Sequence, residues 1–175
     1  MTTRSSSVAS KSGRSGSKKA GSGARKGRPL TLGEELEKAA EGILHTSESD
    51  YPFQFFTLPA ESDDDLTPQG FLSRLGVTEI VIDEFNLPLD RLVEERAFDG
   101  FFPSADELAD RHGTDTNDPE VVAESKQYRK LEAALRKRLR GLKVLRVGQV
   151  EIRCYVAGLD ERGYLAGLVT TAIET

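Results

Sequence analysis

Hydrophobic residues recur with the period of an α-helix directly after residue 30. Thr31 and Glu34 are spaced as the N-cap and N3 residues of a capping box. Most of the charged side chains that follow lie on the face opposite the apolar ones, which predicts an amphipathic helix from Thr31 to about Leu44. Its apolar face consists of Leu32, Leu36, Ala39, Ala40 and Ile43.

Two capping residues that precede a proline predict two further helices. Thr67-Pro68 opens a short helix that runs through Leu75, and Asp118-Pro119 opens a long helix that runs to Arg140. The apolar face of the long helix consists of Val121, Tyr128, Leu131, Leu135 and Leu139. A shorter helical turn is expected at 104–108.

Alternation of apolar and polar residues predicts a β-hairpin in the last 31 residues. The first strand covers 150–157, a connection containing Gly163 follows, and 165–173 forms the closing strand. Upstream, 53–58 and 79–85 have the composition of strands, whereas 92–102 fits a helix or a strand. The order of the elements is not a regular βαβ repeat. It predicts an α+β fold with helices packed on a largely antiparallel sheet.

Charge divides the chain into two parts. Residues 1–28 contain eight Lys and Arg, eight Ser and five Gly without any Asp or Glu, which predicts a disordered basic tail. Residues 29–175 contain 16 basic residues against 29 acidic ones, a net charge of −13. We expect this acidic domain to repel nucleic acid and to attract a basic protein surface. Nucleic-acid contact is therefore expected, if at all, only through residues 1–28.

The long predicted helix has a basic face, which either binds phosphate or is simply solvated. The acidic balance of the domain favours the solvated face, whose cations near the helix end also suit the helix dipole. This face consists of Lys126, Arg129, Lys130, Arg136, Lys137 and Arg140.

Motifs of catalysis and cofactor binding are absent from the sequence: there is no CxxC, HExxH, phosphate-binding glycine loop or GxSxG. We therefore expect a protein without enzymatic activity and without a cofactor. Cys154 lies on the apolar side of an alternating strand, as a buried small hydrophobe does. The run 63–65 (Asp-Asp-Asp) predicts a solvated acidic loop more readily than a cation site, because Ca²⁺ needs six to eight oxygens in a defined loop.

The absence of a membrane-spanning apolar run and of a signal peptide, together with a single cysteine, favours a cytoplasmic location.

Two acidic features remain: Glu48 in a polar loop at 45–50, and the final pair Glu174-Thr175. Hard divalent ions bind oxygen ligands, and the last residue offers a hydroxyl beside an α-carboxylate. Composition and spacing alone favour an ordinary surface glutamate and a frayed terminus.

Three stretches of the sequence resemble the nuclease A inhibitor family, small inhibitors of sugar-nonspecific ββα-metal endonucleases. They are the run 47–53 (Ser-Glu-Ser-Asp-Tyr-Pro-Phe), the long helix into 145–151, and the segment from Tyr155-Val156 through 165–167 to Glu174-Thr175. The resemblance covers about the first and last thirds of residues 29–175. The tail and 59–118 match poorly, and the chain contains no Trp.

The resemblance implies a three-layer α/β/α sandwich like that of plant pathogenesis-related proteins, formed by one domain at 29–175. It also implies a protein that plugs the active site of a nuclease. Glu48 matches the loop glutamate that engages a catalytic arginine, and Thr175 matches the terminal threonine that reaches the Mg²⁺ of the nuclease. Ser47, Asp50 and Glu174 are expected to share this nuclease-binding surface. The chain is therefore expected to take part in metal binding only through Thr175, which would form a bridge to the Mg²⁺ of the nuclease.

A second hypothesis from the residues is an adaptor that binds nucleic acid through residues 1–28 and another protein through the domain. An enzyme is the third hypothesis, for which the sequence offers no positioned set of residues.

Overall fold

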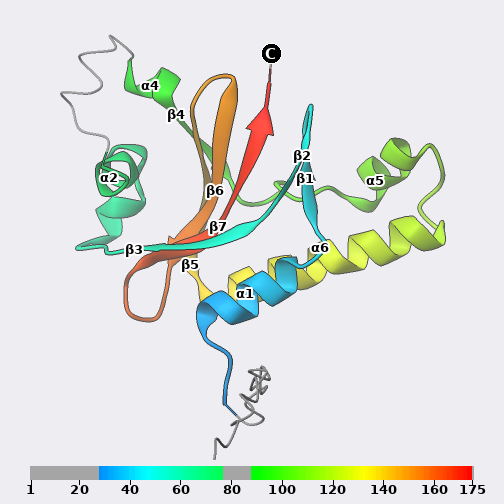
Figure 1. Cartoon of the computed structure of the whole chain (residues 1–175), viewed down its shortest axis with the longest axis horizontal. Helices are drawn as coiled ribbons and strands as arrows, with labels where there is room; N and C mark the ends of the chain where they lie inside the picture. The colour runs from blue at the N-terminus through cyan, green and yellow to red at the C-terminus, as the bar shows by residue number, and fades with distance from the viewer. Residues whose placement is uncertain (1–27, 77–87, 175) are drawn as a thin grey trace, which may run out of the picture.

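A five-stranded antiparallel sheet forms the centre of the computed structural model, which describes residues 28–76 and 88–174 (Figure 1). The long strands β6 and β7 form a hairpin in the middle of the sheet, as the alternating pattern predicts. In spatial order the strands are β3 (Gln54–Leu58), β7 (Leu165–Ile173), β6 (Glu151–Leu159), β5 (Arg140–Val147) and β4 (Val93–Ala97). A separate two-stranded hairpin consists of β1 (Leu44–Thr46) and β2 (Asp50–Pro52).

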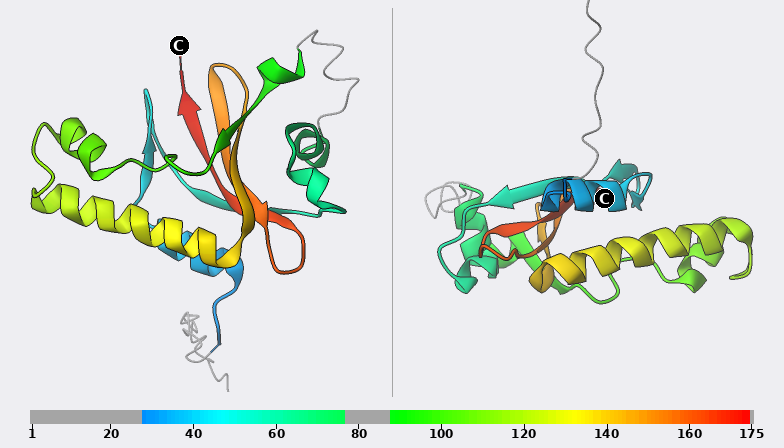
Figure 2. Two further views of the ribbon diagram at one scale, coloured as in Figure 1. Left: turned by 180° about the vertical axis from the view of Figure 1, so that it is seen from behind. Right: turned by 90° about the horizontal axis from the view of Figure 1, so that it is seen from below.

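The sheet buries apolar side chains on both faces, because neighbouring residues of a strand point in opposite directions. Val144 and Val156 pack in one cluster with α1 and α6, whereas Leu145 and Ala157 pack in another with α2. Figure 2 shows α2 and α6 on opposite sides of the β6–β7 hairpin. The helices are α1 (Leu32–Ala40), η1 (Asp63–Leu66), α2 (Pro68–Arg74), α4 (Leu89–Leu92), α5 (Ala105–His112) and α6 (Pro119–Arg138).

The α+β class and the antiparallel sheet are thus confirmed. The finer expectation, a three-layer sandwich like that of pathogenesis-related proteins, stays an inference from the resemblance. The predicted strand at 79–85 and residues 1–27 of the predicted tail at 1–28 lie outside the described residues. Along the described ranges, no helix combines the length and apolar character that crossing a membrane requires.

The helix starts were predicted correctly, but the end of α1 was not. Thr31 caps α1 together with Glu34, and the helix then ends at Ala40 instead of about Leu44. Gly42 adopts a positive φ of 78°, which breaks the helical path, and Leu44 already belongs to β1. The polar stretch 45–50 is therefore part of a hairpin rather than a plain loop.

The two ambiguous stretches of the middle region also resolve. The segment 92–102 splits, since α4 ends at Leu92 and the edge strand β4 covers Val93–Ala97. The predicted turn at 104–108 is the start of the longer helix α5, which Ser104 and Glu107 cap and which ends at His112, before Gly113 in the left-handed conformation. The long helix ends at Arg138, since Arg140 already begins β5.

Candidate functional site

The tip of the β1–β2 hairpin is hydrogen-bonded to the last strand of the sheet. Ser47 Oγ accepts a hydrogen bond from the Ile173 backbone N–H at 3.0 Å, across 126 positions of sequence. The Glu48 N–H donates in turn to the Ile173 carbonyl at 3.4 Å. The turn that carries Glu48 therefore binds both polar backbone groups of Ile173, the last residue of β7.

Local chemistry shapes this tip. The Ser47 hydroxyl donates to the Ser49 carbonyl at 3.1 Å, and the Ser47 N–H reaches the same carbonyl at 3.1 Å. Ser47 thus closes the turn and binds β7 with one side chain. Behind the tip, Tyr128 Oη donates to the Leu44 carbonyl at 2.9 Å, which fixes β1 to α6. Thr170 Oγ1 donates to the Tyr51 carbonyl at 3.2 Å and fixes β2 to β7.

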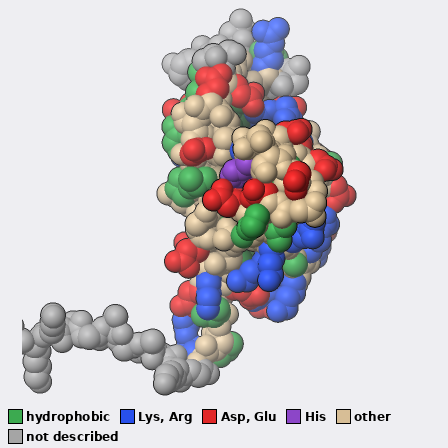
Figure 3. Space-filling model, turned by 90° about the vertical axis from the view of Figure 1, so that its right-hand side faces the viewer, with side chains coloured by type: hydrophobic (Ala, Val, Ile, Leu, Met, Phe, Trp, Pro, Cys, Tyr) green, Lys and Arg blue, Asp and Glu red, His purple; other side chains and the backbone are tan. Residues whose placement is uncertain are grey.

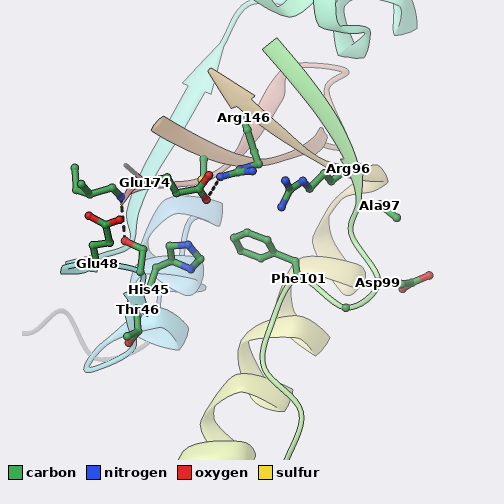
Figure 4. Close-up of a pocket in the computed structure, with 13 residues that line it drawn as sticks. His45, Thr46, Glu48, Arg96, Ala97, Asp99, Phe101, Arg146 and Glu174 are labelled. Carbon is green, nitrogen blue, oxygen red and sulfur yellow. Dashed lines mark hydrogen bonds and ion pairs between the residues drawn. The ribbon is translucent and has the colours of Figure 1, made fainter. Parts of the chain in front are cut away.

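A hollow of about 610 Å³ lies beside the tip, between the hairpin and the connection that follows β4. Figure 4 shows Glu48 and Glu174 on one side of it and Phe101 and Asp99 on the other. The His45 ring stacks on Phe101 with 5.3 Å between centroids and an interplanar angle of 11°. Burial lowers the pKa of His45, and the nearby Arg146 cation lowers it further, so the ring is neutral at pH 7.

Arg96, Arg146 and Glu174 line one wall of the hollow, and Glu94 joins them in a series of alternating charges. Arg96 Nε donates to Glu94 at 2.7 Å, and the other oxygen of Glu94 accepts from Arg146 at 3.0 Å. Arg146 also donates to the carboxylate of Glu174. The hydrogen bond from Arg96, followed by the attraction of both arginines, holds the pKa of Glu94 below its usual range. These four residues therefore form a charge chain from β4 through β5 to the end of β7.

Cys154 lies in the same wall and is buried. Burial raises the pKa of its thiol, although Arg146 opposes the shift. The thiol is therefore protonated at pH 7, which fits the predicted role as a small hydrophobe and makes it a poor nucleophile.

The acidic run 63–65 is a structural feature of η1. Asp65 accepts hydrogen bonds from the backbone N–H groups of Glu61 and Ser62 and pairs with Arg74 at 3.1 Å. Asp63 pairs with Arg140 at 3.2 Å. Within residues 28–76 and 88–174 no three His, Cys, Asp or Glu side chains gather as a metal site would require.

Three cations of the predicted basic face, two in the last turn of α6 and one at the start of β5, also have acidic partners. Arg136 pairs with Asp99 and Glu132, Arg140 pairs with Asp63, and Lys137 lies 3.8 Å from Glu35. These pairs favour the solvated interpretation of the basic face over phosphate binding. On the side of the molecule that Figure 3 shows, acidic side chains gather around a histidine, with basic side chains mainly below them.

Comparison with protein families gives a match that covers nearly all of the described fold. The sequence model described as "Nuclease A inhibitor-like protein" matches residues 31–175. The chain belongs to the nuclease A inhibitor-like family. No individually curated protein matches the chain.

In this nuclease A inhibitor-like protein, the fold brings together most of the residues that the sequence singled out. Glu48 is exposed at the hairpin tip, with Ser47 half-buried beside it. Asp50 is exposed at the start of β2, opposite Thr46. Glu174 follows β7 directly, and its side chain is 54% exposed. Thr175 lies outside the described residues.

Sequence reasoning missed Arg146 as part of this site, and it missed the backbone hydrogen bonds between Ile173 and the hairpin tip. A signal for Arg146 exists, because it is a charged residue in an otherwise apolar strand sequence, Val144-Leu145-Arg146-Val147. The hydrogen bonds of Ile173 use its backbone N–H and carbonyl, which no side-chain pattern can signal.

Proposed function

We propose that the chain inhibits a sugar-nonspecific ββα-metal endonuclease by inserting the Glu48 tip and Thr175 into its active site. Membership of the nuclease A inhibitor-like family supports the inhibition of a nuclease. The observation that carries the finer proposal is the pair of hydrogen bonds between the tip and Ile173. They make the hairpin and the end of β7 one rigid unit, so both elements can enter a partner together.

The chemistry of the two residues suits an active site that binds phosphate. A carboxylate such as Glu48 pairs with an arginine through two parallel hydrogen bonds, and phosphate uses the same geometry. In a chain that ends at Thr175, this residue offers hydroxyl and carboxylate oxygens, the donors that Mg²⁺ prefers. The metal belongs to the nuclease in this proposal, and Thr175 supplies one oxygen toward it. Ser47 and Asp50 complete the surface around these two contacts, and Glu174 directly precedes Thr175 in the chain.

Net charge supports the same partner. Residues 29–175 carry a net charge of −13, while a nuclease that binds DNA presents a basic surface. Opposite charges accelerate the encounter of two proteins and lose this effect as salt increases. We expect the association rate with the nuclease to fall as ionic strength increases, and the dissociation rate to change little.

The direct test is a titration of the folded protein into a ββα-metal endonuclease while DNA cleavage is followed. We expect cleavage to stop near an equimolar ratio. Glu48→Ala should weaken inhibition by about 30- to 5,000-fold, as truncation of a desolvated charge pair costs about 2–5 kcal/mol. Glu161→Ala is a matched control, because Glu161 is also exposed in a hairpin turn, but between β6 and β7. Full cleavage at micromolar excess of folded protein would contradict the proposal for that nuclease.

A further inference from the structure

Arg146 is a charged side chain inside a strand of the central sheet. Only 7% of its side chain is exposed, and its neighbours Val144 and Leu145 are fully buried. A guanidinium removed from water is costly unless carboxylates and hydrogen bonds surround it. Glu94 of the edge strand meets it on one side, and Glu174 meets it on the other.

Glu174 reaches Arg146 from beyond the end of β7. In the register of the sheet, Arg146 lies opposite Cys154 of β6, and Cys154 lies opposite Thr170 of β7. The ion pair therefore spans β6 and the four positions that separate Thr170 from Glu174 along the chain. The Glu174 N–H donates at the same time to the Val150 carbonyl at 3.0 Å. Residue 174 is thus fixed by its backbone and by its side chain, in two different directions.

We propose that the Arg146–Glu174 ion pair is a latch that sets the direction in which the chain leaves β7 and so aims Thr175 at the partner. The inference rests on the proposed function, in which Thr175 is the contact. Glu174 is then a positioning residue rather than a contact, since its carboxylate is engaged by Arg146. Arg146 has the same role from the interior, and Glu94 holds its guanidinium from the opposite side.

A thermodynamic cycle separates this role from a direct contact. Glu174→Gln keeps the shape of the side chain and removes its charge. In the chain that ends at Thr175, we expect it to weaken inhibition by about 3- to 100-fold, the range of coupling between neighbouring groups. In a chain that lacks Thr175, the same substitution should change inhibition by less than about twofold, because nothing remains to be aimed. Glu161→Gln is the control in both backgrounds.

Two results of the cycle would overturn the latch. Equal weakening in both backgrounds would make Glu174 a direct contact. The other result is that removal of Thr175 abolishes inhibition while Glu174→Gln leaves inhibition unchanged. It would mean that the ion pair does not set the direction of the residue that follows it.

Hydrogen exchange tests the latch without any nuclease, so its failure differs from that of the proposed function. The Ile173 and residue 174 amides are bound to the hairpin tip and to Val150. In Glu174→Gln and Arg146→Lys variants, we expect these two amides to exchange about tenfold faster, corrected for intrinsic rates, with Leu168 unchanged. Unchanged exchange at both amides, or faster exchange throughout the sheet, would contradict a local latch.

Discussion

Replacement of Ser47 by Ala tests the connection between the Glu48 tip and the end of β7. The change removes the Oγ atom that accepts from the Ile173 N–H at 3.0 Å and donates to the Ser49 carbonyl at 3.1 Å. The Ser49 carbonyl keeps a partner, since the Ser47 N–H also donates to it at 3.1 Å. The Ile173 N–H loses its acceptor, which is therefore the main cost.

The expected magnitude follows from that single unsatisfied group. A hydrogen bond contributes about 0.5–1.5 kcal/mol net, and a buried N–H without an acceptor costs about 1–3 kcal/mol. Ile173 is only half-buried, so water can approach, and we expect a loss of about 1–1.5 kcal/mol. That loss lowers the midpoint of thermal unfolding by about 2–6 °C in a domain of this size. If the Ser47–Ile173 hydrogen bond also holds the tip in the conformation that binds the nuclease, its loss weakens inhibition by about five- to tenfold.

The assay combines thermal unfolding with inhibition of DNA cleavage on the same Ser47→Ala protein. Ser49→Ala is the matched control, because Ser49 serves the turn through its backbone carbonyl, which the substitution keeps. We expect the control to retain both stability and inhibition. A Ser47→Ala protein that is less stable but inhibits as well as the original would refute the reasoning that the Ser47–Ile173 hydrogen bond holds the tip in its binding conformation.

Three further predictions use other parts of the chain. A Gly-Ser extension after Thr175 should abolish inhibition and leave thermal unfolding unchanged; retained inhibition by the extended chain would count against a terminal contact. Removal of residues 1–28 should abolish any salt-dependent DNA binding in a mobility-shift assay and preserve inhibition, whereas equal DNA binding by the truncated chain would exclude the tail as its cause. Burial alone would raise the pKa of Asp160, but hydrogen bonds from the Tyr164 N–H and from Arg162 outweigh it, so its pKa is lowered. Its ionised form therefore stabilises the fold above about pH 4, the ordinary value, and loses this effect as pH falls through the lowered pKa; urea unfolding of Asp160→Asn should show a loss of about 1.5–3 kcal/mol at pH 7 that shrinks towards pH 2.

Local signals made much of the fold predictable. The capping pairs at Thr31, Thr67 and Asp118 mark the starts of α1, α2 and α6, because a cap depends only on residues within one turn. The alternating pattern after residue 150 likewise marks β6 and β7, because neighbouring residues of a strand lie on opposite faces and reflect the burial of each face. Neither signal requires knowledge of a distant partner.

The site depends on distant partners and was only partly predictable. The hairpin strands β1 and β2 have only three residues each, too few for an alternating pattern to be recognised, so the segment resembles a loop in the sequence. The resemblance singled out Glu48 and Glu174 from sequence runs, but not their surroundings. Arg146 binds Glu174 across 28 positions, and only the register of three strands brings the two side chains together.

We propose that Thr175, alongside Glu48, contacts the nuclease directly. The most direct measurement compares the inhibition constants of chains that end at Glu174 and at Thr175 against one ββα-metal endonuclease. We predict a loss of at least about 100-fold on removal of Thr175, since a lost ligand to a metal or a desolvated charge costs about 3 kcal/mol or more, with an unchanged unfolding midpoint. Equal inhibition by the two folded proteins would contradict the account.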